Sequence, residues 1–214
     1  MNRTSARKRE PAAAASEPRS ARDRSALETR RRLLAAATER FASQGLHATT
    51  TVEIARRAGV AAGTFYLHFE DKHALFREIA LDAFERLRTR LAGASARAPR
   101  DPVAGLRARA EELLDFASEN RAMIGILFGR DPEAAELAED IYDLLVPDIE
   151  AGLRRRIAAG QSAPLDPAAT AQGLAAMWAR VLSWWVEDPS RTTRERVVET
   201  LVALHPFSRR DSHG

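Results

Sequence analysis

The stretch IARRAGVAAGTFYLHFEDK, from Ile54 to Lys72, has the composition of two short helices joined by a tight turn. Thr50 and Glu53, just before and at its start, have the spacing of a capping box, in which a hydroxyl and a carboxylate satisfy amides at the beginning of a helix. A short helix is therefore expected from Thr51 to Ala58. Gly59 readily takes the left-handed backbone conformation of a tight turn, so the chain is expected to reverse there.

A second short helix is expected from Ala61 to Leu67, which completes a helix-turn-helix. Ala55 and Ala58 are small enough for the two helices to cross closely. The apolar side chains that can fill the core beneath the crossing are Val60, Phe65 and Phe69. The second helix is then free to lie in the major groove of DNA.

Side chains around this motif suit contacts with DNA. Hydroxyls and free amides at a helix N-terminus bind phosphate, and a phenol or an ammonium can contact flanking phosphates. Small side chains and a threonine at the start of the second helix can meet base edges, including a thymine methyl. The residues expected to contact DNA are Thr50, Thr51, Ala61, Ala62, Gly63, Thr64, Tyr66, His68 and Lys72.

Charge is distributed unevenly along the 214 residues. Residues 1–80 hold 15 Lys and Arg against 9 Asp and Glu, whereas residues 81–214 hold 18 against 21. A basic front end indicates a polyanionic partner. Residues 1–24 have hardly any large aliphatic side chain and are expected to form a disordered basic tail. Its arginines either lie along DNA or belong to a dispensable leader, and the sequence leaves both possibilities open.

Helical periodicity extends over the rest of the chain. A first helix is expected from Ala26 to Gln44, with Gly45 as its left-handed stop. Asp71 is expected to cap a longer helix that reaches Leu91. The stretch from Ala92 to Pro102 is rich in Ala, Gly, Ser and Pro, which indicates a domain boundary.

Beyond this boundary the sequence again reads as helix, and no stretch alternates like a strand, so the predicted fold is all-α. Pro147 is expected to kink or divide one of these helices. The helices are expected at Pro102–Glu119, Arg121–Phe128, Pro132–Ala159, Pro167–Glu187 and Thr193–Leu204.

From Gly45 to Phe76, the sequence GLHATTTVEIARRAGVAAGTFYLHFEDKHALF resembles the N-terminal domain of the tetracycline-repressor (TetR) family. The family pattern is G-[FY]-x-x-T-T-[VI]-x-x-I-A-x-x-A-G-V-x-x-G-x-[FL]-Y-x-[HY]-F-x-x-K-x-x-L, and the resemblance covers roughly residues 27–80. Thr51 departs from the branched apolar residue of the pattern. The resemblance implies DNA-contact roles for Thr50, Ala62, Gly63, Thr64, Tyr66, His68 and Lys72.

The resemblance also implies a homodimeric transcription regulator, usually a repressor, in which two heads bind a palindromic operator in double-stranded DNA. A divergent helical C-terminal domain would dimerise and hold an unidentified small-molecule effector. The expected organisation is therefore a tail (residues 1–24), a DNA-binding domain with its connecting helix (25–91), an effector-binding and dimerisation domain (102–206) and a second tail (207–214).

Apolar side chains of the second domain can supply an effector pocket and a dimer interface, although each can equally be an ordinary core residue. Arg121 and Arg180 would suit an anionic effector. The expected pocket residues are Phe116, Met123, Leu127, Tyr142 and Trp178. The expected interface residues are Leu174, Val181, Leu182, Trp185, Val197, Leu201 and Leu204.

Two other functions are weighed against a regulator: a helical-bundle metalloenzyme and an effector-independent DNA-binding protein. Glu70 and His73 form one E-x-x-H motif, as in di-iron bundles, but the sequence has no second copy and no nucleotide-binding or zinc-protease motif. No enzyme activity, cofactor or metal is therefore expected. The chain has no cysteine, no signal-peptide pattern and no run of about 20 apolar residues, so a cytoplasmic protein without membrane association is expected.

Overall fold

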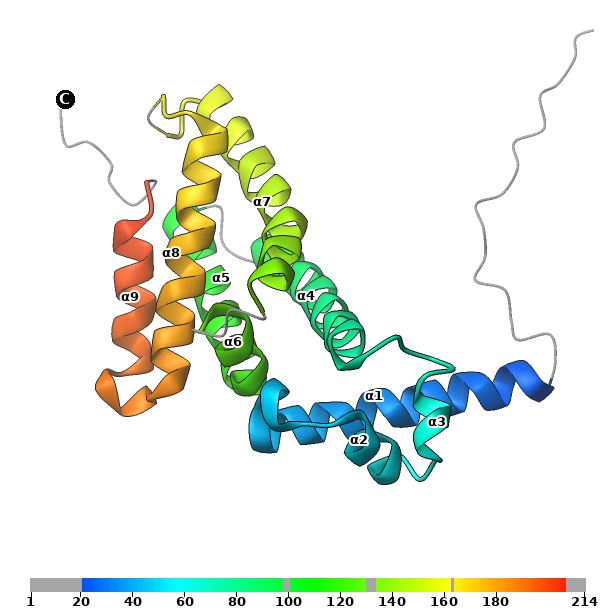
Figure 1. The fold of residues 1–214 in the computed structure, drawn as a ribbon. Coiled ribbons are helices and arrows are strands. Elements are labelled where there is room, and N and C mark those ends of the chain that lie inside the picture. Colours follow the sequence, from blue (N-terminus) through cyan, green and yellow to red (C-terminus); the bar gives the residue numbers. More distant parts are fainter. Residues whose placement is uncertain (1–20, 98–100, 130–133, 163, 207–214) are drawn as a thin grey trace, which may run out of the picture.

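The computed structural model describes residues 21–97, 101–129, 134–162 and 164–206, and every regular element within these ranges is a helix. The N-terminal head contains α1 (Ala21–Ala48), α2 (Thr51–Arg57) and α3 (Ala62–Phe65). Helix α4 (Lys72–Arg97) leads from the head into a helical domain (Figure 1). The predicted all-α fold with an N-terminal helix-turn-helix is confirmed.

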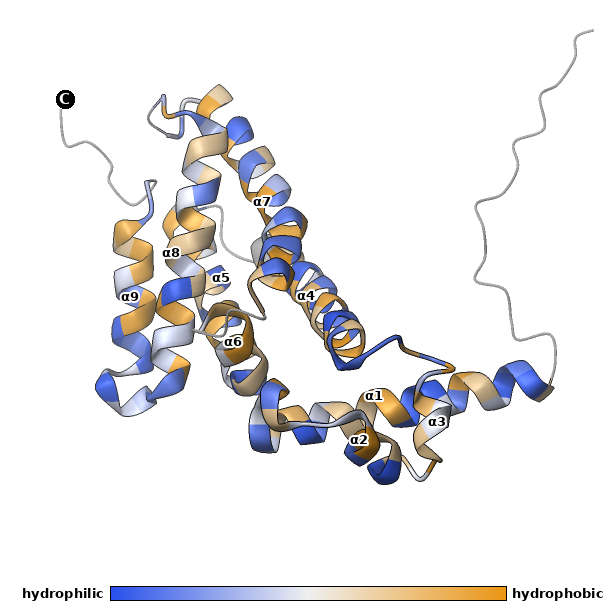
Figure 2. Cartoon of the chain, in the orientation of Figure 1, coloured by the Kyte–Doolittle hydropathy of each residue, from blue (hydrophilic) through white to orange (hydrophobic). Residues whose placement is uncertain are grey.

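The helical domain contains five α-helices and one short 3-10 helix among its described residues. They are α5 (Pro102–Glu119), α6 (Arg121–Phe128), α7 (Ala135–Ala158), α8 (Pro167–Glu187), η2 (Pro189–Arg191) and α9 (Arg194–Leu204). Helix α7 packs on α8, α5 packs on α4 and α9, and α6 packs on α8 and on α1 of the head. Helix α6, which is mostly hydrophobic in Figure 2, therefore joins the two parts of the molecule.

Asp-Pro pairs start the two long helices α5 and α8. The Asp101 carboxylate accepts hydrogen bonds from the amides of Val103 and Ala104, and the Asp166 carboxylate accepts one from the amide of Ala169. Proline suits the first turn because its missing amide hydrogen would have no helical partner there. The predicted starts of both helices are confirmed.

The first helix is longer than predicted. It begins at Ala21, so residues 21–24 of the expected tail are helical, while residues 1–20 and 207–214 lie outside the described residues. An acidic side chain, Asp23, lies in its first turn, where it interacts favourably with the partial positive charge of the helix N-terminus. At its other end Gly45 interrupts the helix with φ 80° and ψ 173°, which is a positive φ but an extended ψ rather than the left-handed helical conformation expected.

Helix α4 also runs past its predicted end at Leu91 and reaches Arg97. Leu91 and Ala94 are buried, and alanine is the strongest helix former, so this Ala-rich segment continues the helix. Residues 92–97 of the expected boundary are therefore helical, and the domain boundary itself stays a prediction. In addition, Pro147 lies inside α7 without dividing it.

One hydrophobic core extends from the head into the helical domain. It includes Leu33 and Phe41 of α1, Phe65 of α3, Phe84 of α4 and Leu201 of α9. Because the core is continuous, the packing of α4 is sensitive to both parts of the molecule.

Candidate DNA-binding surface and internal cavity

The capping box that the sequence predicts is present at the start of α2. The amide of Glu53 donates to the Thr50 hydroxyl oxygen over 3.2 Å, and the amide of Thr50 donates to the Glu53 carboxylate over 3.0 Å. These hydrogen bonds, with the Thr50 backbone amide as the first cause, lower the pKa of Glu53 below its usual value. The carboxyl group of Glu53 is therefore deprotonated in the folded head at neutral pH.

The turn between α2 and α3 is built as the sequence predicts. Gly59 has φ +69°, and its amide donates to the Arg56 carbonyl over 3.1 Å. Ala55 and Ala58 are buried at the helix crossing, and so are Phe65 and Phe69 beneath it. Helix α3 is shorter than the predicted span from Ala61 to Leu67, because turns replace the helix after Phe65.

The start of α3 presents a small, accessible surface to solvent. Ala61, Ala62 and Gly63 are exposed and Thr64 is half-buried, so the backbone can approach a neighbouring molecule closely. Tyr66 is 60% exposed, and its hydroxyl lies 3.0 Å from the Thr51 hydroxyl. His68 is half-buried one turn further on. These predicted contact residues thus lie along the outer side of the helix-turn-helix.

Lys72 has a structural role that the sequence did not indicate. Its ammonium donates to the carbonyl oxygens of Leu46 over 2.9 Å and of His47 over 3.0 Å, at the end of α1. An ammonium has three donors, so two of them hold the α1–α2 junction and the third is available for a phosphate. A DNA contact by Lys72 stays a prediction.

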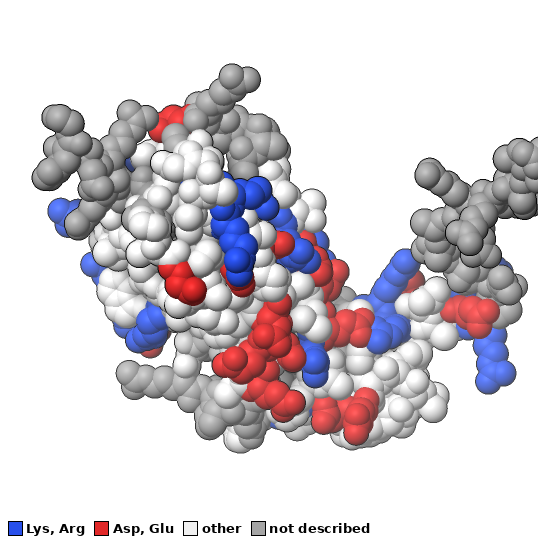
Figure 3. All heavy atoms as spheres, turned by 90° about the horizontal axis from the view of Figure 1, so that it is seen from above, with Lys and Arg blue, Asp and Glu red and all other residues white. Residues whose placement is uncertain are grey.

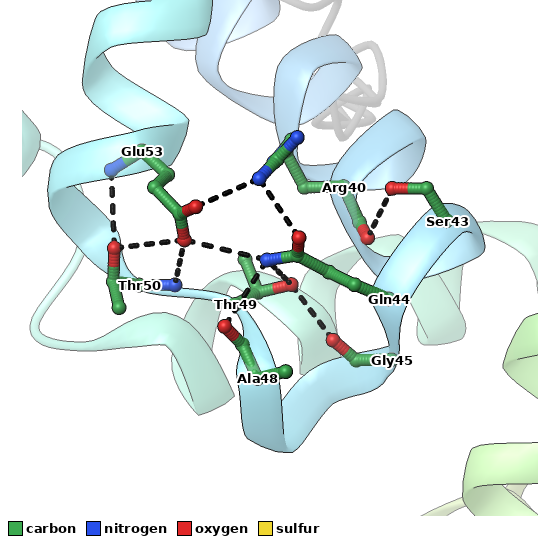
Figure 4. Close-up of polar contacts among 8 residues, drawn as sticks. All are labelled: Arg40, Ser43, Gln44, Gly45, Ala48, Thr49, Thr50 and Glu53. Carbon is green, nitrogen blue, oxygen red and sulfur yellow. Dashed lines mark hydrogen bonds and ion pairs between the residues drawn. The ribbon is translucent and has the colours of Figure 1, made fainter.

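A polar network behind α2 was also missed by the sequence reasoning. Arg40 donates to the Glu53 carboxylate over 2.7 Å and to the Gln44 side-chain oxygen over 2.8 Å. The buried Thr49 hydroxyl donates to the Gly45 carbonyl over 2.7 Å and accepts from Gln44 (Figure 4). The network fixes the angle at which α2 leaves α1. The i, i+4 spacing of Arg40 and Gln44 is the sequence signal that could have revealed this network.

The helical domain contains a cavity of about 470 Å³ between α4, α5, α7 and α8. Its wall is mainly apolar, and an aromatic cluster forms one side of it. The ring centroids of Phe84 and Phe116 are 5.1 Å apart, those of Phe84 and Phe128 are 6.1 Å apart, and those of Phe128 and Tyr142 are 5.8 Å apart. Burial raises the pKa of the Tyr142 phenol. This size and composition suit a small organic ligand.

Three of the five expected pocket residues line this cavity: Phe116, Tyr142 and Trp178. Met123 and Leu127 do not, because their side chains are buried on other sides of α6. Arg121 and Arg180 are exposed away from it, so the expected anion contact through them finds no support. The charged residues in the wall are instead Arg88, Arg109, Asp148, Arg155 and Arg156, with His205 beside them.

Most of the expected dimer-interface residues lie inside the chain. Leu174 and Leu182 line the cavity, and the buried core takes up Trp185, Val197 and Leu201. A side chain that is buried in one protomer cannot form the contact surface of a dimer. Val181 is half-buried, and Leu204 is 57% exposed. The apolar stripes on α8 and α9 are thus largely core, which was the alternative interpretation.

Neither a metal site nor a membrane span is found in the part of the chain that the structure describes. No group of three or more His, Asp or Glu side chains there could hold a metal ion, and this includes the surroundings of the single E-x-x-H at Glu70 and His73. None of the described helices is long and apolar enough to cross a membrane.

Comparison with known proteins connects these features to one family. Residues 33–79 match the family model described as bacterial regulatory proteins, tetR family. The HTH-type transcriptional regulator YdgC of Bacillus subtilis, itself uncharacterized, is 30% identical over 131 residues, which cover 60% of this chain and 67% of that protein.

Solved structures agree with this assignment over most of the chain. NalD of Pseudomonas aeruginosa, the secondary repressor of the MexAB-OprM multidrug efflux pump, is 26% identical with a TM-score of 0.64, covering 84% of this chain and 94% of that one. The transcriptional regulator FadR of Bacillus subtilis, in complex with stearoyl-CoA, is 17% identical with a TM-score of 0.70, covering 84% of this chain and 98% of that one. With its helix-turn-helix head and helical second domain, the chain belongs to the TetR family of DNA-binding transcriptional regulators.

Proposed function

We propose that this regulator is a homodimeric repressor that leaves a palindromic operator when a small molecule occupies the cavity of the helical domain. The observation that carries the proposal is the position of α4. This helix begins at Lys72, which holds the α1–α2 junction, and further along it contributes Phe84, Leu87 and Arg88 to the cavity wall. A ligand in the cavity therefore touches the same rigid element that supports the head.

Two ion pairs link α4 to α7, one nearer the head and one at the cavity. Arg88 of α4 donates to the Asp148 carboxylate of α7 over 2.8 Å, and Arg77 of α4 lies 3.0 Å from the Asp140 carboxylate of α7. A ligand that separates α4 from α7 would favour a conformation with a different head position. In a dimer, recognition helices that are no longer about 34–36 Å apart would not fit two successive major grooves.

The proposed dimer face is the exposed side of α8, which differs from the stripe expected from the sequence. Gly173 and Ala176 are exposed there and would allow a second helix to approach closely. Arg180 and the partly exposed Trp184 continue the same side. The side chains of this face are small at one end and include an aromatic ring at the other, which suits the packing of two α8 helices around a two-fold axis.

DNase footprinting on fragments selected from random DNA tests the proposal. We expect a protected palindrome, its two half-sites one helical turn or a multiple apart, and loss of protection when a cavity ligand is added. The variant Gly152→Leu should fill the cavity, since a Cβ at Gly152 meets only the Arg155 guanidinium at 4.0 Å. It should keep operator affinity and lose the ligand response.

The matched control is Arg154→Leu, which adds an apolar side chain at an exposed position two residues further along α7. This variant should respond to ligand as the unmodified protein does. Operator binding by a monomer would overturn the dimeric arrangement. An operator complex that no cavity ligand releases would support the effector-independent DNA-binding protein instead.

A further inference from the structure

The charges in the cavity wall are strongly biased towards positive. Among the described residues that line it are four arginines, Arg88, Arg109, Arg155 and Arg156, and a single carboxylate, Asp148. That carboxylate accepts a hydrogen bond from Arg88, which also contacts Glu85 outside the cavity. The described lining residues thus include more guanidiniums than carboxylates.

Arg156 lies close enough to Arg109 to disfavour the positive charge of Arg109. Burial, together with the nearby charge of Arg156, lowers the pKa of Arg109. Burial and the charges of Arg156 and Arg109 lower the pKa of His205 to about 4, so this imidazole is neutral at physiological pH. Like charges gathered in a partly desolvated site are unfavourable, and an anion placed among them would relieve the repulsion.

Part of the basic wall comes from helix ends that lie away from the head, and part of the aromatic wall comes from α6, which packs on the head. Arg156 is in the last turn of α7 and His205 caps the end of α9, and both helix ends lie away from the head in Figure 1. Phe128 ends α6, which packs on α1 of the head. Seen from above in Figure 3, basic side chains gather on the surface of the helical domain, and they are arginines because residues 81–214 contain no lysine.

We propose that the cavity binds an elongated apolar molecule that ends in an anionic group. The anion is held by the guanidiniums of Arg109 and Arg156, and the apolar chain runs towards Phe84, Phe116 and Phe128. This inference rests on the proposed function for the biological role of the cavity. The structure assigns the head group only as an anion, so a carboxylate and a phosphate ester are both candidates.

Titration of the DNA-free protein with four decyl compounds tests the inference, with tryptophan fluorescence as the readout because Trp178 lines the cavity. The compounds are decanoate, decyl phosphate, decanol and decyltrimethylammonium, each below its micelle concentration. We expect at least one of the two anions to bind roughly tenfold or more tightly than decanol, the size expected for charge-assisted hydrogen bonds. The cation should bind most weakly.

The variants Arg109→Gln and Arg156→Gln should each reduce the anion-to-decanol affinity ratio severalfold, while decanol binding stays within about twofold. Arg154→Gln is the matched control, because Arg154 is exposed on the same helix, pairs with Glu150 and is not part of the wall. Its ratio should be unchanged. Equal or tighter binding of decanol by the unmodified protein would overturn the proposal without any variant.

The same compounds added to the operator complex keep this inference distinct from the proposed function. Anion-selective binding without release from the operator would contradict the effector role and leave the assigned ligand class standing. Release by decanol or by the cation, without anion selectivity, would support the effector role of the cavity and contradict the assigned ligand class.

Discussion

Lys72→Met is expected to destabilise the folded protein as well as to weaken DNA binding. The substitution removes the charged donor from the Leu46 and His47 carbonyl oxygens, which lie 2.9 and 3.0 Å from the ammonium. Hydrogen bonds to charged groups contribute about 1.5–3 kcal/mol when they are sheltered, and much less when they are exposed. The bond to Leu46 is partly buried and the bond to His47 is exposed, so their joint loss should cost about 2 kcal/mol.

A loss of this size should lower the Tm by about 4–8 °C in a chain of this length. Differential scanning calorimetry of the variant, without DNA, measures it directly. Arg86→Met is the control, because Arg86 lies on the same helix and makes only an exposed pair with Asp82 one turn away. Its Tm should change by about 1 °C or less.

The dependence of operator affinity on salt separates the two roles of Lys72. If the third donor contacts a phosphate, the slope of log K against log salt should become shallower by about 0.9 for each head. A reduced slope with an unchanged Tm would refute the conclusion that Lys72 holds the α1–α2 junction. A lowered Tm with an unchanged slope would remove Lys72 from the DNA contacts and keep its structural role.

Three further predictions concern the head. Thr64→Ala should change the base preference in a binding-site selection, whereas Tyr66→Phe should weaken binding to all sites alike; the opposite pattern would reverse their assigned roles. Gly59→Ala should lower the unfolding free energy by about 1–2 kcal/mol in chemical denaturation, because φ is +69° there, whereas Gly63→Ala, with ordinary φ and open space around its Cβ, should not. Because the folded pKa of Glu53 is lowered, its contribution is present above the unfolded value of 4.5 and is lost as the pH falls through the folded value. Unfolding measured from pH 7 to 3 should thus show a smaller loss of stability in Glu53→Gln than in the unmodified protein, and parallel curves would contradict this.

Local chemistry determined the head almost completely. The capping box at Thr50 and Glu53, the positive φ of Gly59 and the buried Phe65 and Phe69 all follow from interactions within about 20 residues of sequence, where spacing and residue type are sufficient. The sequence-based predictions were wrong about where some helices end. Leu91 was expected to end α4, yet alanine-rich sequence continues a helix once its apolar side is covered by a neighbour.

Only the tertiary structure decided which apolar and charged side chains share a site. From the sequence alone, the buried Leu182 and Leu201 cannot be distinguished from dimer-interface residues. Helical periodicity shows which side of a helix is apolar but not what covers that side. Likewise, Arg109 and Arg156 are 47 positions apart on different helices, and their convergence on one cavity depends on how α5 and α7 pack. The sequence by itself thus determined the fold class and the DNA-binding motif, whereas long-range packing determined the cavity, its charge and the part Lys72 plays in supporting the head.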